Sequence, residues 1–167
     1  EDRSAEQLSM MLAISLSNIK NFYDEKHDKS SFIKNIILDN ILPSDIYLKS
    51  KELHFANDIT RVVFLIKFGA KNEIIPYDIM QNLFPGKTKD FVISVGENDT
   101  VLVKEVKPYD DVKEIEKIAR SIADTISAEF YTKVSIGIGT VVDNLKDLAR
   151  SYKEAQIALE VGKVFDT

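Results

Sequence analysis

The spacing of apolar residues along the chain changes between the three-to-four-residue period of helices and the two-residue period of strands. This pattern predicts helices over residues 4–23, 31–42, 45–53, 76–84, 112–126 and 145–162, and strands over 60–68, 91–95, 101–106 and 133–140. From residue 60 onward the order is strand, helix, hairpin, helix, strand, helix. That order matches the split βαβ plan, so the sequence predicts an α+β, ferredoxin-like fold with an antiparallel-dominated sheet and packed helices.

The strand predicted over 60–68 has apolar residues on both of its faces. Val62, Phe64 and Ile66 alternate with Val63 and Leu65, so neither side of the strand is polar. Strands of this kind are covered on both faces. We therefore expect this strand at the centre of the sheet.

Turn-forming and capping residues predict where the helices begin and end. Pro43 is expected to end the helix over 31–42, because proline disfavours the helical conformation of the residue before it. Ser44 or Asp45 would then cap the short helix that follows. The core side of the helix over 31–42 would consist of Phe32, Ile33, Ile36, Ile37 and Ile41. Asp110 or Asp111 would cap a longer helix with Val112, Ile115, Ala119, Ile122 and Ile126 inside.

The first helix carries an apolar stripe of its own, formed by Leu8, Leu12, Leu16, Ile19 and Tyr23. Ser4 and Gln7 fit a capping box at its start, and the polar run 24–28 is expected to end it. Two interpretations are open: the stripe pairs with a second copy of the chain in a homodimer, or it folds back onto its own domain. The pattern divides the chain into a linker helix over 1–28 and a domain over 29–167.

Composition narrows the class of protein. The chain of 167 residues has a net charge of −5 and an isoelectric point near 5.1, which argues against a nucleic-acid-binding surface on this piece. It contains no cysteine, which excludes disulfides and thiolate zinc sites and suits a cytoplasmic protein. No apolar run reaches the roughly 18 residues of a membrane span, so we expect no membrane contact. The chain begins at Glu1 within a helical pattern, and we expect it to be a fragment of a longer protein.

The most specific motif is Lys133-Val-Ser-Ile-Gly-Ile-Gly-Thr140 with the helical segment after it. Its apolar residues alternate with Ser135, Gly137 and Gly139, so one face of the predicted strand carries only small side chains. Close packing against that face is expected from a neighbouring segment, a partner chain or a flat ligand. Asp143 or Asn144 would cap the helix that follows, whose stripe is Leu145, Leu148, Tyr152, Ala155, Leu159 and Gly162.

This motif and the helix over 148–159 resemble the end of the GGDEF-like middle domain of bacterial transcription regulators of the purine-catabolism and carbohydrate-diacid (PucR/CdaR) type. The resemblance covers roughly residues 32–167 and implies a fold related to nucleotide cyclases. In active diguanylate cyclases the hairpin loop reads Gly-Gly-Asp/Glu-Glu-Phe. Here the matching residues are Gly96, Glu97, Asn98, Asp99 and Thr100.

The resemblance locates cyclase chemistry at this loop and at the end of the first strand, where carboxylates hold the magnesium ions. Glu97 stands in place of the second glycine, and Asn98 replaces the metal-binding acid. The strand end, residues 66–71, contains no acid and offers Lys67 instead, which can bind phosphate but not Mg²⁺. We therefore expect no catalytic residue, no metal and no cofactor, and the chain is not expected to be an enzyme.

The resemblance implies a non-catalytic regulatory domain that supplies dimerisation or signal relay in a transcription regulator. DNA would be bound by a C-terminal helix-turn-helix that this fragment does not include, and the effector is left open. The alternative is a sensory module that binds a nucleotide or metabolite without turnover, supported by the small-residue face of the strand over 134–139 and by Lys67. An active nucleotidyl cyclase is the least favoured interpretation.

Overall fold

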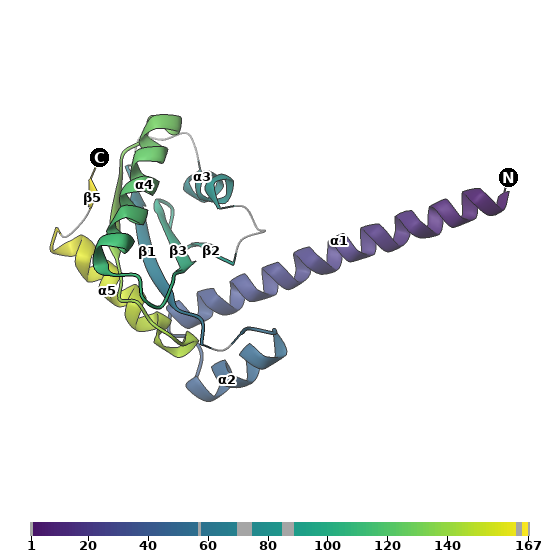
Figure 1. Cartoon of the computed structure of the whole chain (residues 1–167), viewed down its shortest axis with the longest axis horizontal. Helices are drawn as coiled ribbons and strands as arrows, with labels where there is room; N and C mark the ends of the chain where they lie inside the picture. The colour runs from purple at the N-terminus through teal and green to yellow at the C-terminus, as the bar shows by residue number, and fades with distance from the viewer. Residues whose placement is uncertain (1, 57, 70–74, 85–88, 163–164, 167) are drawn as a thin grey trace.

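The computed structural model describes residues 2–56, 58–69, 75–84, 89–162 and 165–166, except for the side chains of residues 22, 23, 165 and 166. Its helices are α1 (Asp2–Ile37), α2 (Pro43–Glu52), α3 (Pro76–Leu83), α4 (Val112–Phe130) and α5 (Leu148–Glu160), with a 3₁₀ turn, η1, at Leu145–Asp147. Its strands are β1 (Arg61–Phe68), β2 (Phe91–Ser94), β3 (Asp99–Glu105), β4 (Val134–Ile138) and β5 (Phe165–Asp166). Figure 1 shows α1 projecting far beyond the rest of the molecule.

The sheet has the order β2-β3-β1-β4-β5, and every neighbouring pair is antiparallel. The first four strands in this order form the split βαβ arrangement, so the predicted α+β fold is confirmed. β1 pairs with both β3 and β4, which makes it the central strand, as its two apolar faces predict. The short β5, which extends the sheet beyond β4, was not predicted.

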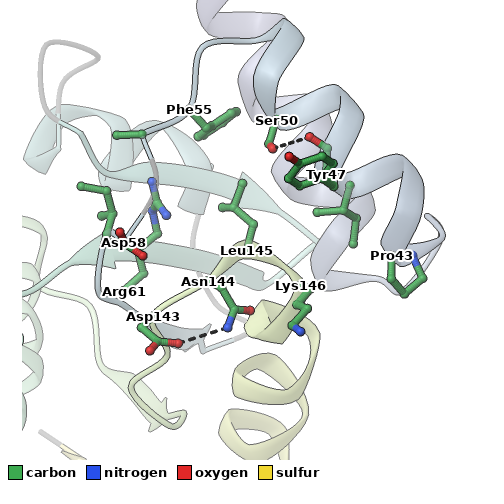
Figure 2. Close-up of a pocket in the computed structure, with 13 residues that line it drawn as sticks. Pro43, Tyr47, Ser50, Phe55, Asp58, Arg61, Asp143, Asn144, Leu145 and Lys146 are labelled. Carbon is green, nitrogen blue, oxygen red and sulfur yellow. Dashed lines mark hydrogen bonds between the residues drawn. The ribbon is translucent and has the colours of Figure 1, made fainter.

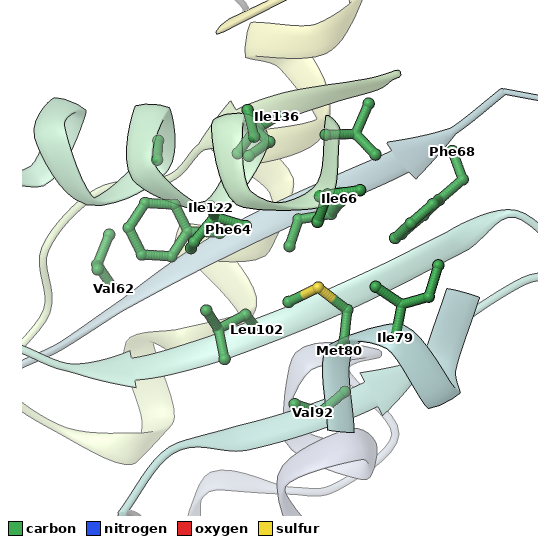
Figure 3. Packing of buried hydrophobic residues seen from close by; sticks show 14 of the residues in the cluster. Val62, Phe64, Ile66, Phe68, Ile79, Met80, Val92, Leu102, Ile122 and Ile136 are labelled. Atoms are coloured by element: carbon green, nitrogen blue, oxygen red, sulfur yellow. The ribbon is translucent and has the colours of Figure 1, made fainter. Parts of the chain in front are cut away.

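One face of the sheet is covered by α3 and α4. Phe64 and Ile66 of β1 pack there with Leu102 of β3 and Ile136 of β4, beneath Ile122 of α4 (Figure 3). Each of these side chains is at most 5% exposed. Burial of these side chains between helices and sheet supplies the hydrophobic stabilisation of this half of the fold.

The opposite face is covered by the end of α1, by α2 and by η1 with α5. Ile33 and Ile36 of α1 pack there with Val63 of β1, Val101 of β3 and Leu148 of α5. The last third of α1 therefore belongs to the core, whereas its first part does not. Lys26 marks the transition, since its Nζ donates to the Asp90 carbonyl oxygen at 3.2 Å and lies 4.4 Å from the centre of the Phe91 ring.

The predicted break between two N-terminal helices is wrong, because α1 runs without interruption through residues 24–28. That run is polar, but it contains neither glycine nor proline, and Glu25 and Lys29 form an ion pair one turn apart at 3.4 Å. The capping box is also wrong, since Asp2 and Arg3 are already helical before Ser4. A polar run therefore does not end a helix when each of its residues can adopt the helical conformation.

Pro43 was expected to end a helix, and instead it begins one. α1 ends at Ile37, and Pro43 is the first residue of α2, where the missing N–H of proline leaves no helical hydrogen bond unmade. The N-cap of α2 is Leu42, without a side-chain bond, so neither Ser44 nor Asp45 caps it. The predicted apolar residues of 31–42 are nevertheless confirmed as core, with Ile41 half-buried.

Most predicted helix features after β1 are confirmed. Asp111 caps α4, its Oδ1 accepting a hydrogen bond from the Glu114 N–H at 2.9 Å. Asn144 caps the 3₁₀ turn η1 through the Asp147 N–H at 3.1 Å, whereas α5, which was predicted to begin there, starts at Leu148 with Asp147 as its N-cap and no side-chain bond. The prediction that Val112 lies inside is wrong, because its side chain is 73% exposed. Val112 lies in the first turn of α4, ahead of the point where that helix meets the sheet. None of the described helices is both long and apolar enough to cross a membrane.

Candidate functional site

The degenerate loop connects β2 and β3 in a tight hairpin. The Val95 N–H donates to the Asp99 carbonyl oxygen at 3.1 Å, and the Ser94 hydroxyl donates to the Gly96 carbonyl oxygen at 3.3 Å. Asp99 and Thr100, which were predicted as loop residues, already belong to β3. Only residues 96–98 therefore form the tip of the hairpin.

The hairpin tip lies against the end of β1, as the resemblance to cyclases implies. The Phe68 N–H donates to the Asn98 carbonyl oxygen at 2.9 Å, and Lys67 is directly opposite Asp99 in the β1–β3 register. The two segments that carry the metal carboxylates in cyclases are thus adjacent in this chain. Residues 70–74, which follow β1, lie outside the described residues.

The acid at the fourth loop position, Asp99, lies on the face of the sheet that α5 covers. Its side chain is half-buried, and its Oδ1 is buried without a hydrogen-bond partner. Burial of the Tyr152 phenol, and secondly the charge of Asp99, raise the pKa of Tyr152 above its ordinary value. Glu97, in contrast, is exposed at the tip. Within the described part of the chain, no three acidic or histidine side chains are grouped so that they could hold a metal ion.

The small-residue face of β4 is filled by α5. A Cβ atom on Gly137 would collide with the Ala155 carbonyl oxygen, and one on Gly139 with the Ser151 carbonyl oxygen. The buried Ser151 hydroxyl accepts from the Val63 N–H at 3.2 Å and donates to the Thr140 carbonyl oxygen at 2.6 Å. Of the three expected occupants, the neighbouring segment is the one observed against Gly137 and Gly139.

The apolar stripe of α1 is exposed rather than folded back. Leu8, Leu12, Leu16 and Ile19 are between 53% and 66% exposed, and the Tyr23 side chain lies outside the described residues. The N-terminal part of α1, which carries these residues, projects beyond the rest of the domain (Figure 1). These four residues therefore contribute nothing to the core of their own domain.

Arg61 is a site residue that the sequence reasoning missed. It begins β1, is only 7% exposed, and lines a cavity between α2 and the segment 143–146. The signal was present in the sequence, since Arg61 is a charged residue at the start of a strand expected to be covered on both faces. A charge at such a position requires a partner, which the pattern of apolar residues does not supply.

Comparison with known families agrees with this geometry. A family model described as GGDEF-like domain matches residues 39–161, well over half of the chain. Searches among curated proteins and among solved structures found no match. With its split βαβ sheet, its hairpin against the end of β1 and this family match, the chain belongs to the GGDEF-like domain family.

Proposed function

We propose that this GGDEF-like domain is the non-catalytic regulatory domain of a bacterial, cytoplasmic transcription regulator of the PucR/CdaR type. In this proposal α1 joins two copies into a homodimer and relays signals between the parts of the parent protein. A C-terminal helix-turn-helix of that parent would bind the DNA. The observation that carries the proposal is the exposed apolar stripe on the projecting part of α1.

The stripe supports dimerisation through the free energy of burying apolar surface. A large aliphatic side chain contributes about 1.5–3 kcal/mol when it is moved from water into a packed environment. Leu8, Leu12, Leu16 and Ile19 share one side of the helix at spacings of four, four and three residues. A second copy of α1 offers the same side chains at the same spacing, so each stripe can cover the other.

The continuity of α1 supports a role in relay. The helix that carries the exposed stripe also carries Phe32, Ile33 and Ile36, which are at most 2% exposed in the core. No glycine or proline interrupts α1 between these two parts. A rotation or shift of the helix pair would therefore act directly on the buried residues beside β1.

The proposed absence of turnover is supported by the composition of the hairpin and the strand end. Glu97 puts a negative side chain where a triphosphate approaches in cyclases, and Asn98 replaces the metal-binding acid. Lys67, Phe68 and Gly69 supply no carboxylate at the end of β1. Magnesium in phosphoryl-transfer sites is held by carboxylates together with substrate phosphates. The missing acid in the hairpin and the missing acid at the end of β1 would therefore affect the same ion.

The dimer is tested by light scattering at tens of micromolar protein. The unaltered chain should have twice the 18.9 kDa mass of one copy. The double substitution Leu12→Asp and Leu16→Asp should give a monomer whose domain still unfolds cooperatively, because neither side chain is part of the core.

The matched control for this test adds the same charge elsewhere on α1. Ser17 and Asn21 lie roughly on the opposite side of the helix at 3.6 residues per turn. Ser17→Asp with Asn21→Asp should therefore leave the dimer intact. A monomeric unaltered chain would refute dimerisation through α1, and so would an equal loss of dimer in both double variants.

A further inference from the structure

A cavity of about 370 Å³ lies beside the start of β1, bounded by α2, by residues 55, 56, 58, 59 and 61, and by residues 143–146 (Figure 2). Its size is at the lower end of the range for small-molecule sites. Apolar side chains form part of its wall, namely Ile46, Phe55 and Leu145. Its polar side chains include Arg61, Asp58, Asp143 and Lys146.

Arg61 provides a positive charge that the protein itself satisfies poorly. Its backbone is held in place by two hydrogen bonds with Val142, each 2.8 Å long, while its side chain reaches toward the cavity between Asp58 and Phe55 (Figure 2). The Arg61 Nε is buried and has no hydrogen-bond partner. None of the ion pairs among the described residues includes Arg61.

The surroundings of Arg61 compensate its charge only in part. Glu105 is directly opposite in β3 and favours the charged form, but burial is the larger effect and lowers the pKa of Arg61. The Phe55 ring centre lies 5.8 Å from the guanidinium carbon, which adds a weak cation–π contact. A buried guanidinium without a hydrogen-bonded anion is costly, so the site favours a ligand that carries one.

The rim of the cavity carries two carboxylates and one cation, the exposed Lys146. Asp58 and Asp143 are both exposed, and Asp143 is held in position by a 3.1 Å hydrogen bond from the Asn144 side chain. Two carboxylates and one cation give the rim a net negative charge, which disfavours a doubly charged anion such as a phosphate ester. A ligand with a carboxylate at one point, a cationic group at another and an apolar side chain would satisfy Arg61, the rim and the wall together.

We propose that this cavity binds a free α-amino acid with an apolar side chain, whose carboxylate pairs with Arg61 and whose ammonium group lies toward Asp58 and Asp143. The site is distinct from the cyclase-like hairpin, and the proposal does not depend on dimerisation. Ile46 and Leu145 of the cavity wall belong to the same buried cluster as Ile33 and Ile36 of α1. Occupation of the cavity would thus act on the packing that holds α1 to the sheet.

Binding is tested by NMR titration of the ¹⁵N-labelled chain with L-leucine and with L-phenylalanine. At least one of them should cause saturable shifts at the amides of Ile46, Phe55 and Leu145. Leucine methyl ester lacks the carboxylate, and 4-methylpentanoate lacks the ammonium group, so both should bind at least about tenfold more weakly. The absence of saturable shifts with both amino acids would overturn the proposal. Equal affinity for 4-methylpentanoate would overturn its amino-acid specificity.

Two substitutions separate a ligand-binding Arg61 from a structural one. Arg61→Met keeps the aliphatic stem and should weaken binding by about tenfold or more, whereas Arg150→Met, at an exposed arginine of α5, should leave it unchanged. Arg61→Met should also leave the thermal midpoint unchanged or raise it, because an unpaired buried charge is removed. A clearly lowered midpoint would assign Arg61 to the core and contradict the proposal.

A second variant tests the rim without touching the core. Asp143 is exposed, so Asp143→Asn has no buried contact to disturb. It should weaken the binding of the amino acid, whose ammonium group meets this carboxylate, and leave the weaker binding of the anion 4-methylpentanoate unchanged or slightly strengthened, because a like charge is removed. Equal effects on both ligands would contradict the proposed orientation.

Discussion

Gly137 and Gly139 bring the backbone of β4 against the backbone of α5, and at this distance no side chain fits between them. The short distance between β4 and α5 also lets the Ser151 hydroxyl form two hydrogen bonds. It accepts from the Val63 N–H of β1 and donates to the Thr140 carbonyl oxygen after β4. Individual residues of the most specific motif in this chain therefore serve packing. Their small size is required by the helix, not by a ligand.

This requirement predicts the effect of adding a single methyl group. Gly139→Ala should lower the free energy of unfolding by about 3 kcal/mol, because the Ser151 carbonyl oxygen occupies the space and belongs to the backbone. Gly96→Ala is the matched control: its Cβ would lie 3.6 Å from that of Asp99, an ordinary contact. It should change the free energy by about 0.5 kcal/mol or less. Urea unfolding measures both values, and equal effects would contradict the packing argument.

Among the elements, α1 departs most from its prediction, because one continuous helix has a buried end and an exposed end. Its last third packs against the sheet, whereas Leu8 and Leu12 lie exposed beyond the domain. The connection between them is polar and is helical without any core contact from His27 or Asp28, which are both exposed. The residues of this connection are all compatible with a helix, and the last third of α1 is held in place by its packing against the sheet. Together these two conditions extend the helix through this region.

The continuity of α1 can be tested at His27. His27→Pro removes a helical hydrogen bond and clashes with the preceding turn, so it should uncouple residues 2–26 and reduce the far-ultraviolet circular dichroism of the helix. The segment after residue 27 can keep its packing, because proline is tolerated in the first turn of a helix. The thermal midpoint of the domain should therefore change little.

The control for this test is His27→Ala, which keeps the hydrogen bond and removes only an exposed side chain. It should retain the full helical signal. If His27→Pro left the signal unchanged as well, the helix would already be broken near residues 24–28.

At the scale of the whole molecule, a sheet covered on both faces places the cyclase-like hairpin at one end and the Arg61 cavity near the other end of β1. The hairpin lies beside Lys67 and Phe68, whereas Arg61 begins the strand. The architecture therefore separates the hairpin from the Arg61 cavity along β1, and the two places carry different polar side chains. Fold alone does not specify chemistry, which depends on those side chains.

The side chains of the hairpin and of the end of β1 predict how the whole domain responds to a nucleotide. Calorimetric titration of the chain with GTP and Mg²⁺ should give flat heats, because Glu97, Asn98 and Lys67 stand where a cyclase holds triphosphate and metal. ATP in the same buffer serves as the control for non-specific heats. Saturable binding of GTP that requires Mg²⁺ would contradict the proposed absence of a cyclase site.

The sequence predicted the regular elements of the domain well, since these depend on residues close to one another. The alternation in β1 and the apolar spacing in α4 identified core residues such as Phe64, Ile66 and Ile122 before any contact was known. The caps at Asp111 and Asn144 were predictable for the same reason, because each side chain bonds to a backbone N–H three residues later. Errors occurred where two local signals competed, as at Pro43, which fits the end of one helix and the start of another.

By itself, the sequence determined the order of helices and strands from β1 to α5, the split βαβ plan and the altered hairpin, because periodicity and motif identity are properties of neighbouring residues. Only the tertiary structure decided that α5 fills the face of Gly137 and Gly139, that the stripe of α1 stays exposed, and that Arg61 borders a cavity with Asp58 and Asp143. Those outcomes depend on surfaces formed by residues far apart in the chain. Whether such surfaces meet depends on the packing of the whole fold, which a local sequence pattern does not describe.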